Sequence, residues 1–259
     1  MEQSGLHVEN VTVRFGGFTA VEDVSFYAKP GAITSIVGPN GAGKSSLLNA
    51  VMGLVPLTSG EISIEGLPIS RTPAWKRTKL GLGRAFQHVQ LFDSLTVAQN
   101  VMLGRNHLMH YGVFAAGLWL KRAREEELRH RAAVEELLAF FELERWRNHN
   151  AKLLPYGVQK IVGLARAVAA EPKVLLLDEV GSGLTREEKE NLARFIWRLQ
   201  AQGSRAILWV EHDVGMIRDL SDSVVVLNYG RKLAEGRAED IFSRSEVREA
   251  FIGLHAETT

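Results

Sequence analysis

The pattern of apolar and polar residues along the chain predicts an α/β protein. Three continuous apolar runs, 32–37 (AITSIV), 174–179 (VLLLDE) and 206–212 (AILWVEH), are typical of buried strands in parallel sheets. The first run leads through a glycine-rich stretch to LLNAVMGL at 47–54, which has helical character. Near the N-terminus, VTVRF at 11–15 alternates as a half-exposed strand does. The pattern therefore places a strand, a loop and a helix in succession at the start of the core.

The glycine-rich stretch fits a phosphate-binding loop. Gly38, four further residues, Gly43, Lys44 and Ser45 match the pattern G-x-x-x-x-G-K-[ST]. Glycines let backbone N–H groups turn around phosphate oxygens, the lysine reaches the β- and γ-phosphates, and the serine hydroxyl ligates Mg²⁺. The sequence thus predicts binding of ATP and Mg²⁺. The predicted nucleotide-binding loop consists of Gly38, Pro39, Asn40, Gly41, Ala42, Gly43, Lys44, Ser45 and Ser46.

Acidic and imidazole side chains stand where the two later apolar runs end. Asp178 and Glu179 close one run, and His212 closes the other. The carboxyl ends of parallel strands border the ligand crevice of an open α/β sheet. We expect Asp178 to hold Mg²⁺ through a water, Glu179 to deprotonate the water that attacks the γ-phosphate, and His212 to contact that phosphate. The alternatives are a solvated turn for the two acids and a purely structural histidine.

Composition removes several other classes of function. The 259 residues carry 31 Lys and Arg against 30 Asp and Glu, so no long-range attraction to nucleic acid or anionic lipid is expected. Without cysteine, thiol and zinc–thiolate chemistry is excluded. No apolar run approaches the roughly 20 residues that span a bilayer, and MEQSGLHVEN lacks the features of a signal peptide. We expect one compact cytoplasmic unit that meets a membrane only through protein contacts.

Four motifs, GPNGAGKS, LPYGVQ, VLLLDE and VEHD, resemble those of the ATP-binding subunits of ABC transporters across nearly the whole chain. The resemblance implies a P-loop NTPase (RecA-like) α/β core with a mainly parallel sheet, an N-terminal antiparallel β region and an inserted α-helical subdomain. It also implies one nucleotide-binding domain over residues 1–259. The expected parts are a core at about 6–92 and 170–240, a helical subdomain at about 93–169 and a C-terminal helical tail at about 241–259.

The resemblance assigns roles to two further residues. Gln87, in GRAFQHVQLF, corresponds to the glutamine that contacts Mg²⁺ and the attacking water and connects to the membrane subunits. Phe15, in VRFGG, corresponds to the aromatic residue that stacks on adenine, although the pattern alone also allows an inward-facing strand residue. The implied catalytic residues are Glu179, His212, Gln87 and Lys44. The implied metal ligands are Ser45, Gln87 and, through water, Asp178.

Within the family, the chain looks most similar to the subunits for branched-chain and other hydrophobic amino acids. RFGGFTAVEDVSF, VEHDVGMI and the long insertion after Gln87 are among the features that suggest it. Import of amides or urea and export of lipopolysaccharide are the alternatives. The implied partners are a second ATP-binding subunit, two transmembrane permease subunits and, indirectly, a solute-binding protein. They would gather at the cytoplasmic face of the inner membrane, with a heterodimer favoured over a homodimer.

Two other classes of ABC protein fit less well. Soluble members that act in DNA repair or translation carry a long coiled coil between the two nucleotide motifs, or two cassettes per chain. This chain has one cassette and no room for such a coiled coil between Lys44 and Asp178. A regulator that binds ATP without hydrolysing it would not require the general base that Glu179 supplies.

The segment between Gln87 and Lys152 is helical in pattern and rich in charge. Thr96 followed by Gln99 fits a capping box and predicts a helix start. A later amphipathic helix is indicated by apolar residues at helical spacing, Val134, Leu137, Leu138 and Phe141. The resemblance makes this segment the receptor for a membrane subunit's coupling helix, and a packed excursion without a partner is the alternative. The apolar stretch 110–120 either lines that groove or covers the subdomain.

LPYGVQ departs from the Leu-Ser-Gly-Gly-Gln that is common in the family. Pro155 replaces the serine and Val158 the glutamine. The apolar spacing that follows predicts a helix over about Tyr156–Ala170, and proline is accepted in a first helical turn. In the family this helix start faces the γ-phosphate of ATP held by the opposite subunit, so Gly157 is expected to bind nucleotide in trans. We expect a weakened clamp that still functions.

A second departure follows Glu179, where VGSGLT replaces the more usual Pro-Thr-Ser-Ala-Leu-Asp. Thr185 followed by Glu188 fits a capping box, so the next helix keeps its start without the aspartate. Signalling between subunits through this loop is put in doubt. The two departures together suggest that this chain's own phosphate site is the stronger of two unequal sites in a heterodimer.

Overall fold

A computed structural model describes residues 4–109 and 121–252, and the stretch 110–120 lies outside the described residues. The strands are β1 (Leu6–Phe15), β2 (Phe18–Ala28), β3 (Ile33–Val37), β4 (Ser59–Ile64), β5 (Leu67–Pro68), β6 (Leu82–Ala85), β7 (Val174–Asp178), β8 (Ala206–Val210), β9 (Ser223–Asn228) and β10 (Arg231–Gly236). The helices are α1 (Lys44–Met52), α2 (Ala74–Arg77), α3 (Val97–Gly104), α5 (Lys121–Phe140), α6 (Tyr156–Ala169), α7 (Arg186–Ala201), α8 (Val214–Leu220), α9 (Ala238–Ile241) and α10 (Ser245–Ile252). Short 3₁₀ helices occupy 78–80, 106–108, 144–146 and 151–153.

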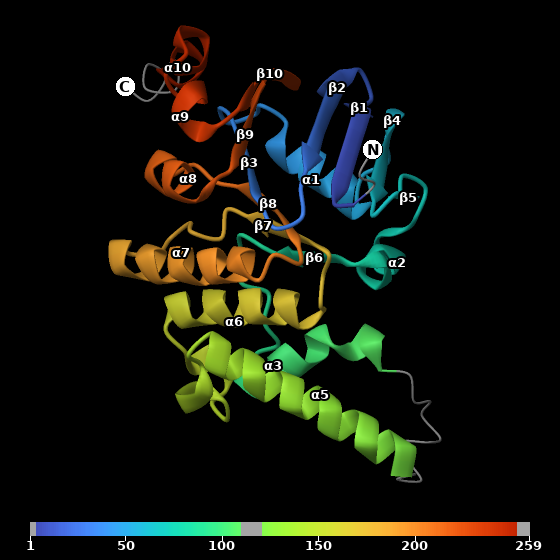
Figure 1. Ribbon diagram of the computed structural model, residues 1–259, viewed down its shortest axis with the longest axis vertical. Coiled ribbons are helices and arrows are strands. Elements are labelled where there is room, and N and C mark those ends of the chain that lie inside the picture. Colours follow the sequence, from blue (N-terminus) through green and yellow to red (C-terminus); the bar gives the residue numbers. More distant parts are fainter. Residues whose placement is uncertain (1–3, 110–120, 253–259) are drawn as a thin grey trace.

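The strands form two sheets (Figure 1). The larger has the order β10-β9-β3-β8-β7-β6, in which β9, β3, β8, β7 and β6 run parallel and β10 pairs antiparallel at one edge. The smaller is antiparallel and has the order β2-β1-β4-β5. The mainly parallel core and the N-terminal antiparallel region that the sequence predicts are therefore confirmed.

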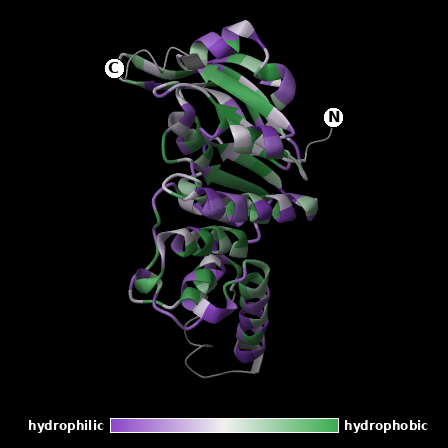
Figure 2. Ribbon diagram, turned by 90° about the vertical axis from the view of Figure 1, so that its left-hand side faces the viewer, coloured by the Kyte–Doolittle hydropathy of each residue, from purple (hydrophilic) through white to green (hydrophobic). Residues whose placement is uncertain are grey.

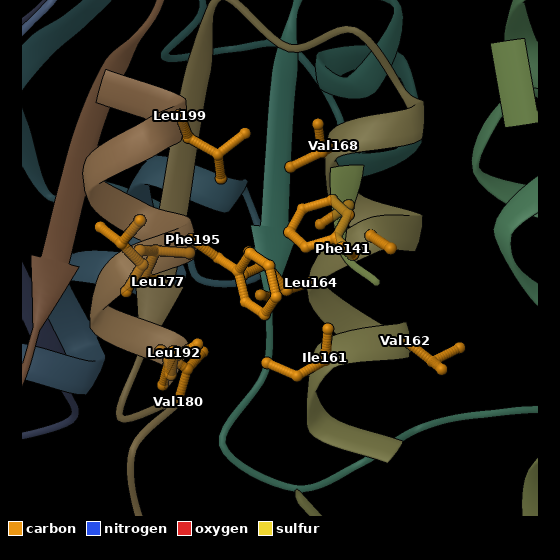
Figure 3. Packing of buried hydrophobic residues seen from close by; sticks show 14 of the residues in the cluster. Phe141, Ile161, Val162, Leu164, Val168, Leu177, Val180, Leu192, Phe195 and Leu199 are labelled. Atoms are coloured by element: carbon orange, nitrogen blue, oxygen red, sulfur yellow. The ribbon is translucent and has the colours of Figure 1, made fainter. Parts of the chain in front are cut away.

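Strand β7 lies in the interior of the molecule, which explains its continuously apolar sequence. All five of its residues are buried, because layers of the protein cover both faces of the sheet. Leu175 and Leu177 pack into a cluster with α5, α6 and α7, where Phe141 and Phe195 meet with ring centroids 5.3 Å apart (Figure 3). Leu176 faces the opposite cluster, formed with α1 and the antiparallel sheet. Packing on both faces thus fixes the strand, and with it the positions of Asp178 at its end and Glu179 directly after it.

The helices between β6 and β7 pack against one another and against the sheet. In Figure 1, α3, α5 and α6 occupy the lower half of the molecule, below α7, and α6 contacts strand β6 directly. Figure 2 shows the strands as mainly hydrophobic and the helices as mixed along their surfaces. The apolar residues predicted to form a helix face lie here, with Val134, Leu138 and Phe141 buried and Leu137 partly buried. Both predicted capping boxes, at Thr96 and at Thr185, are formed.

A buried arginine holds the far end of α1, the helix that follows the phosphate-binding loop. Arg77 is 2% exposed, and its Nη1 donates to the carbonyl oxygens of Ala50 and Val51 at 2.8 and 2.6 Å. Its Nε and Nη2 donate to the carbonyls of Thr72 and Ser70. The last carbonyls of a helix have no partner within the helix and carry partial negative charge. The guanidinium therefore satisfies this end of α1 and ties it to the segment before α2.

We predict that Arg77→Met lowers the free energy of unfolding by about 3 kcal/mol or more, because several buried carbonyls lose a charged donor. Urea denaturation monitored by circular dichroism would measure the change. Arg71→Met is the matched control, since Arg71 is exposed and its loss should cost less than about 0.5 kcal/mol. Equal stability of the two variants would contradict the prediction.

Candidate functional site

The loop between β3 and α1 takes the backbone path that its glycines permit. Gly38 and Gly43 have φ values of 150° and 98°, in the region that disfavours other residues. A Cβ at Gly38 would lie 2.1 Å from the carbonyl oxygen of Leu227, and one at Gly43 would lie 2.3 Å from that of Ala20. Neither space admits a side chain. The loop is thereby pressed against neighbouring strands and leads directly into the N-terminus of α1.

A pocket of about 260 Å³ opens over this loop. Its lining consists of Phe18, Ala20, the loop residues Asn40, Gly41, Ala42, Gly43, Lys44, Ser45 and Ser46, and Glu179. The N-terminus of α1 faces it, and helix N-termini favour anions through their free N–H groups and the helix dipole. The pocket thus brings seven of the nine predicted loop residues together with the predicted general base.

Lys44 turns back over its own loop. Its Nζ donates to the carbonyl oxygens of Gly38 and Pro39, both at 2.8 Å. Burial lowers the pKa of Lys44, and the nearby negative charge of Glu179 opposes that shift. Because carbonyls are weaker partners for an ammonium than phosphate oxygens, this arrangement leaves the side chain ready to exchange partners when an anion enters.

Three of the predicted catalytic side chains meet at Glu179. Its Oε2 accepts from Nε2 of Gln87 at 2.6 Å, and its Oε1 lies 2.6 Å from Nε2 of His212. Gln87 follows β6, Glu179 follows β7 and His212 follows β8, so neighbouring strands deliver all three to one edge of the sheet. Glu179 adopts a φ of 45°, a left-handed conformation that is uncommon outside glycine, asparagine and aspartate. Two side chains from different strands therefore fix the carboxylate above the phosphate-binding pocket.

Asp178 is held by a residue that the sequence analysis did not single out. Nη2 of Arg84 lies 2.5 Å from Oδ2 of Asp178, and Nη1 donates to Oδ1 of Asn49 at 2.9 Å. The Arg84 and Asp178 side chains are 6% and 13% exposed, so the ion pair is shielded from water. The available signal was a single basic residue within the short strand β6, too weak to show its partner 94 positions away. Arg84 thus orients the acid expected to serve the metal.

The oxygen donors near the loop are of the kind that Mg²⁺ prefers. Ser45 offers a hydroxyl, Asp178 a carboxylate and Gln87 an amide whose nitrogen is engaged by Glu179. Among residues 4–109 and 121–252, no group of three or more His, Asp and Glu side chains is clustered to hold a metal. Mg²⁺ commonly keeps waters and phosphate oxygens in its shell, so the three oxygen donors of Ser45, Asp178 and Gln87 would be sufficient protein ligands for it.

Five predicted nucleotide contacts lie outside the lining of this pocket: Phe15, Gly38, Pro39, Asp178 and Gly157. Phe15 is about half exposed at the end of β1 and pairs in register with Phe18, which does line the pocket. The hairpin therefore places the ring of Phe18 in the pocket lining, with Phe15 as its partner on the neighbouring strand. The sequence analysis named only Phe15, because it relied on the match of VRFGG to the family motif, and a motif match does not show which ring lines the pocket.

The LPYGVQ segment begins a helix where the sequence places it. Pro155 is the N-cap of α6 with φ of −52° and ψ of 146°, and it supplies no side-chain cap. The side-chain amide of Gln159 donates one hydrogen bond to the carbonyl of Leu154, and the first backbone N–H groups of the helix have no intrahelical partner and can bind an anion. A Cβ at Gly157 would lie 2.2 Å from Oε1 of Glu188, so a larger residue there would have to displace the end of that side chain.

Similarity to known proteins agrees with this geometry. The family model described as ABC transporter matches residues 21–182. BraF of Pseudomonas aeruginosa, a high-affinity branched-chain amino acid transport ATP-binding protein, is 33% identical over 98% of this chain and 99% of its own length. LivG of Escherichia coli, which carries the same description, is 33% identical over the same shares of the two chains.

Solved structures lead to the same fold. The ADP conformation of MJ1267, an ATP-binding cassette of an ABC transporter, superposes with a TM-score of 0.83 at 27% identity, covering 96% of this chain and 98% of that one. A nucleotide-free ATP-binding cassette gives a TM-score of 0.82 at 27% identity, with 95% and 98% covered. In the part of the chain that is described, no helix is long and apolar enough to cross a membrane. The chain therefore belongs to the ABC transporter family, as one of its ATP-hydrolysing, nucleotide-binding cassettes.

Proposed function

We propose that this chain is the ATPase subunit of an importer for branched-chain or other hydrophobic amino acids. The similarity to BraF and LivG over nearly the full length of all three chains carries the substrate class. The chain would act at the cytoplasmic face of the inner membrane, bound to two permease subunits that receive solute from a binding protein. The helices inserted between β6 and β7, within about 93–169, would receive the coupling helices of those permeases.

The side chains of the pocket divide the work of hydrolysis. Lys44 would leave the carbonyls of Gly38 and Pro39 and bind the β- and γ-phosphates. Glu179 would accept a proton from the attacking water, while Gln87 and His212 keep its carboxylate in place. Mg²⁺, when bound beside Ser45, Gln87 and Asp178, would neutralise charge on the phosphates. Phe15, or Phe18 beside it, would stack on the adenine.

A second ATP-binding subunit would complete each site from the opposite side. The N–H groups at Gly157 and the start of α6 would bind the γ-phosphate held by that subunit. Because Pro155 supplies no hydroxyl and Val158 no amide, the site that uses this α6 would be the weaker one. A heterodimer whose partner retains the serine would therefore contain one strong and one weak site.

We predict that Glu179→Gln keeps ATP binding and lowers turnover about 10²- to 10⁴-fold, since the amide cannot accept the proton from water. Phosphate release by the purified complex and equilibrium binding of labelled ATP would measure the two quantities. Glu61→Gln, at an exposed position of β4, is the control and should leave both unchanged. Turnover of the Glu179 variant close to that of the wild type would remove this residue from the role of general base.

Pro155→Ser should strengthen the weaker site. Restoring one hydrogen bond to a charged phosphate is worth roughly 1.5–3 kcal/mol, or about tenfold or more in affinity or rate at that site. Pro73→Ser is a matched control, because Pro73 is also a helix N-cap without a side-chain bond, at α2. The site that uses this α6 contains the catalytic glutamate of the partner. Its ATPase rate can therefore be measured by itself in a complex that carries Glu179→Gln in this chain and keeps the partner's glutamate. No gain at that site would show that the proline costs the clamp nothing.

Transport in proteoliposomes tests the substrate class. The complex of this chain with its copurifying membrane subunits should accumulate labelled leucine when ATP and the binding protein are supplied. A complex with Lys44→Ala should accumulate none, because the phosphate loop would no longer bind nucleotide. Accumulation of urea or a short amide, with leucine excluded, would overturn the proposed substrate and leave the ATPase assignment in place.

A further inference from the structure

Lys160 is a buried cation in α6 that lies outside the lining of the pocket over the phosphate loop. It lies one helical turn after Gly157 and is 5% exposed. Its Nζ donates to the backbone carbonyl oxygen of Gln87, and it stands 5.4 Å from the centre of the Tyr156 ring. Lysine is almost never fully buried without a partner. The carbonyl oxygen of Gln87 is such a partner, so the burial of this cation depends on where the Gln87 backbone lies.

The surroundings of Lys160 are acidic. Burial lowers its pKa, while the negative charges of Glu211, Glu179 and Asp178 oppose that shift. Glu211 is itself 5% exposed, and its Oε2 has no hydrogen-bond partner among the described residues. The ammonium of Lys160 thus supplies positive charge to three carboxylates from the ends of β7 and β8.

A continuous series of contacts runs from α6 to the general base. Lys160 holds the main chain of Gln87, the side chain of Gln87 holds Glu179, and Glu179 contacts His212. Gln87 lies beyond the last residue of β6, where the sheet no longer fixes the backbone. The lysine is therefore a hydrogen-bond contact that ties the Gln87 peptide directly to α6.

We propose that Lys160 is a positioning residue that couples the start of α6 to the catalytic carboxylate through Gln87. The inference rests on the proposed function, in which the start of α6 binds nucleotide held by a second subunit. When that binding shifts α6, Lys160 moves the Gln87 peptide with it and brings the Gln87 amide and Glu179 into register with the attacking water.

The first test uses the isolated chain and requires no hydrolysis. Since the protein has no cysteine, His88→Cys places a single nitroxide on the exposed residue next to Gln87. Lys160→Met should add a mobile component to the electron paramagnetic resonance spectrum, and Lys160→Arg should not. Two controls should show no change. One is Lys152→Met with the label at position 88, since the Lys152 side chain is 70% exposed, and the other is Lys160→Met with the label moved to the exposed position Ser243→Cys. An unchanged spectrum at position 88 in Lys160→Met would overturn the proposal.

The second test is kinetic and uses the assembled complex. Lys160→Met should lower kcat about tenfold, as expected for losing a charged donor, and should change KM for ATP less than about twofold. In a Gln87→Ala background the same substitution should cost less than about twofold, because its connection to Glu179 is already broken. Lys160→Arg should restore most of kcat. A full tenfold loss in both backgrounds would indicate a structural role and overturn the proposal.

Lys160→Gln serves if the methionine variant does not fold, because it keeps a donor and removes the charge and reach of lysine. It should give the same mobile label and the same loss of kcat, and wild-type values for both would overturn the proposal. A wild-type complex without ATP turnover would contradict the proposed function, while the nitroxide result would still decide whether Lys160 holds the segment after β6.

Discussion

The order of strands in the parallel sheet is the constraint on which the site depends. Because the parallel strands β3, β8, β7 and β6 are neighbours, the segments that follow them all begin at the same edge of the sheet. The phosphate loop, His212, Glu179 and Gln87 are each the continuation of one of these strands. Burial of both sheet faces and the backbone ladders between the strands hold the four segments relative to one another, and the Glu179 N–H extends that ladder by donating to the carbonyl oxygen of Val210. Hydrophobic burial in the core thereby sets the geometry of polar groups at the rim.

Each of three cations at this edge contacts an acceptor within the chain. Lys44 is bound to carbonyls of its own loop, Arg84 to Asp178, and Lys160 to Gln87. A buried charge without a partner is costly, so each cation takes the nearest acceptor. Binding of a polyanion would replace some of these contacts with stronger ones. The affinity for nucleotide is then a difference between two sets of bonds, and not the sum of the new ones.

Features carried by local patterns were predictable from the sequence. The apolar run of β7, the start of α6 at Tyr156 and the capping boxes at Thr96 and Thr185 depend on neighbours within a few positions. The meeting of Gln87, Glu179 and His212 followed from the family resemblance and from the rule for strand ends. The pairing of Arg84 with Asp178 and the contact of Lys160 with Gln87 could not be predicted, because they join side chains distant in sequence whose types have many possible partners.

The positive φ of Glu179 has a consequence for how the protein can evolve. Glycine or asparagine would adopt that backbone with less conformational cost, typically about 1 kcal/mol or more. A population selected only for folding would therefore tend to lose the glutamate, and replacement there could yield a more robust but inactive protein. As the proposed general base, Glu179 would be a site where activity and thermal tolerance compete, because selection for ATP turnover would have to outweigh the gain in stability from replacing it.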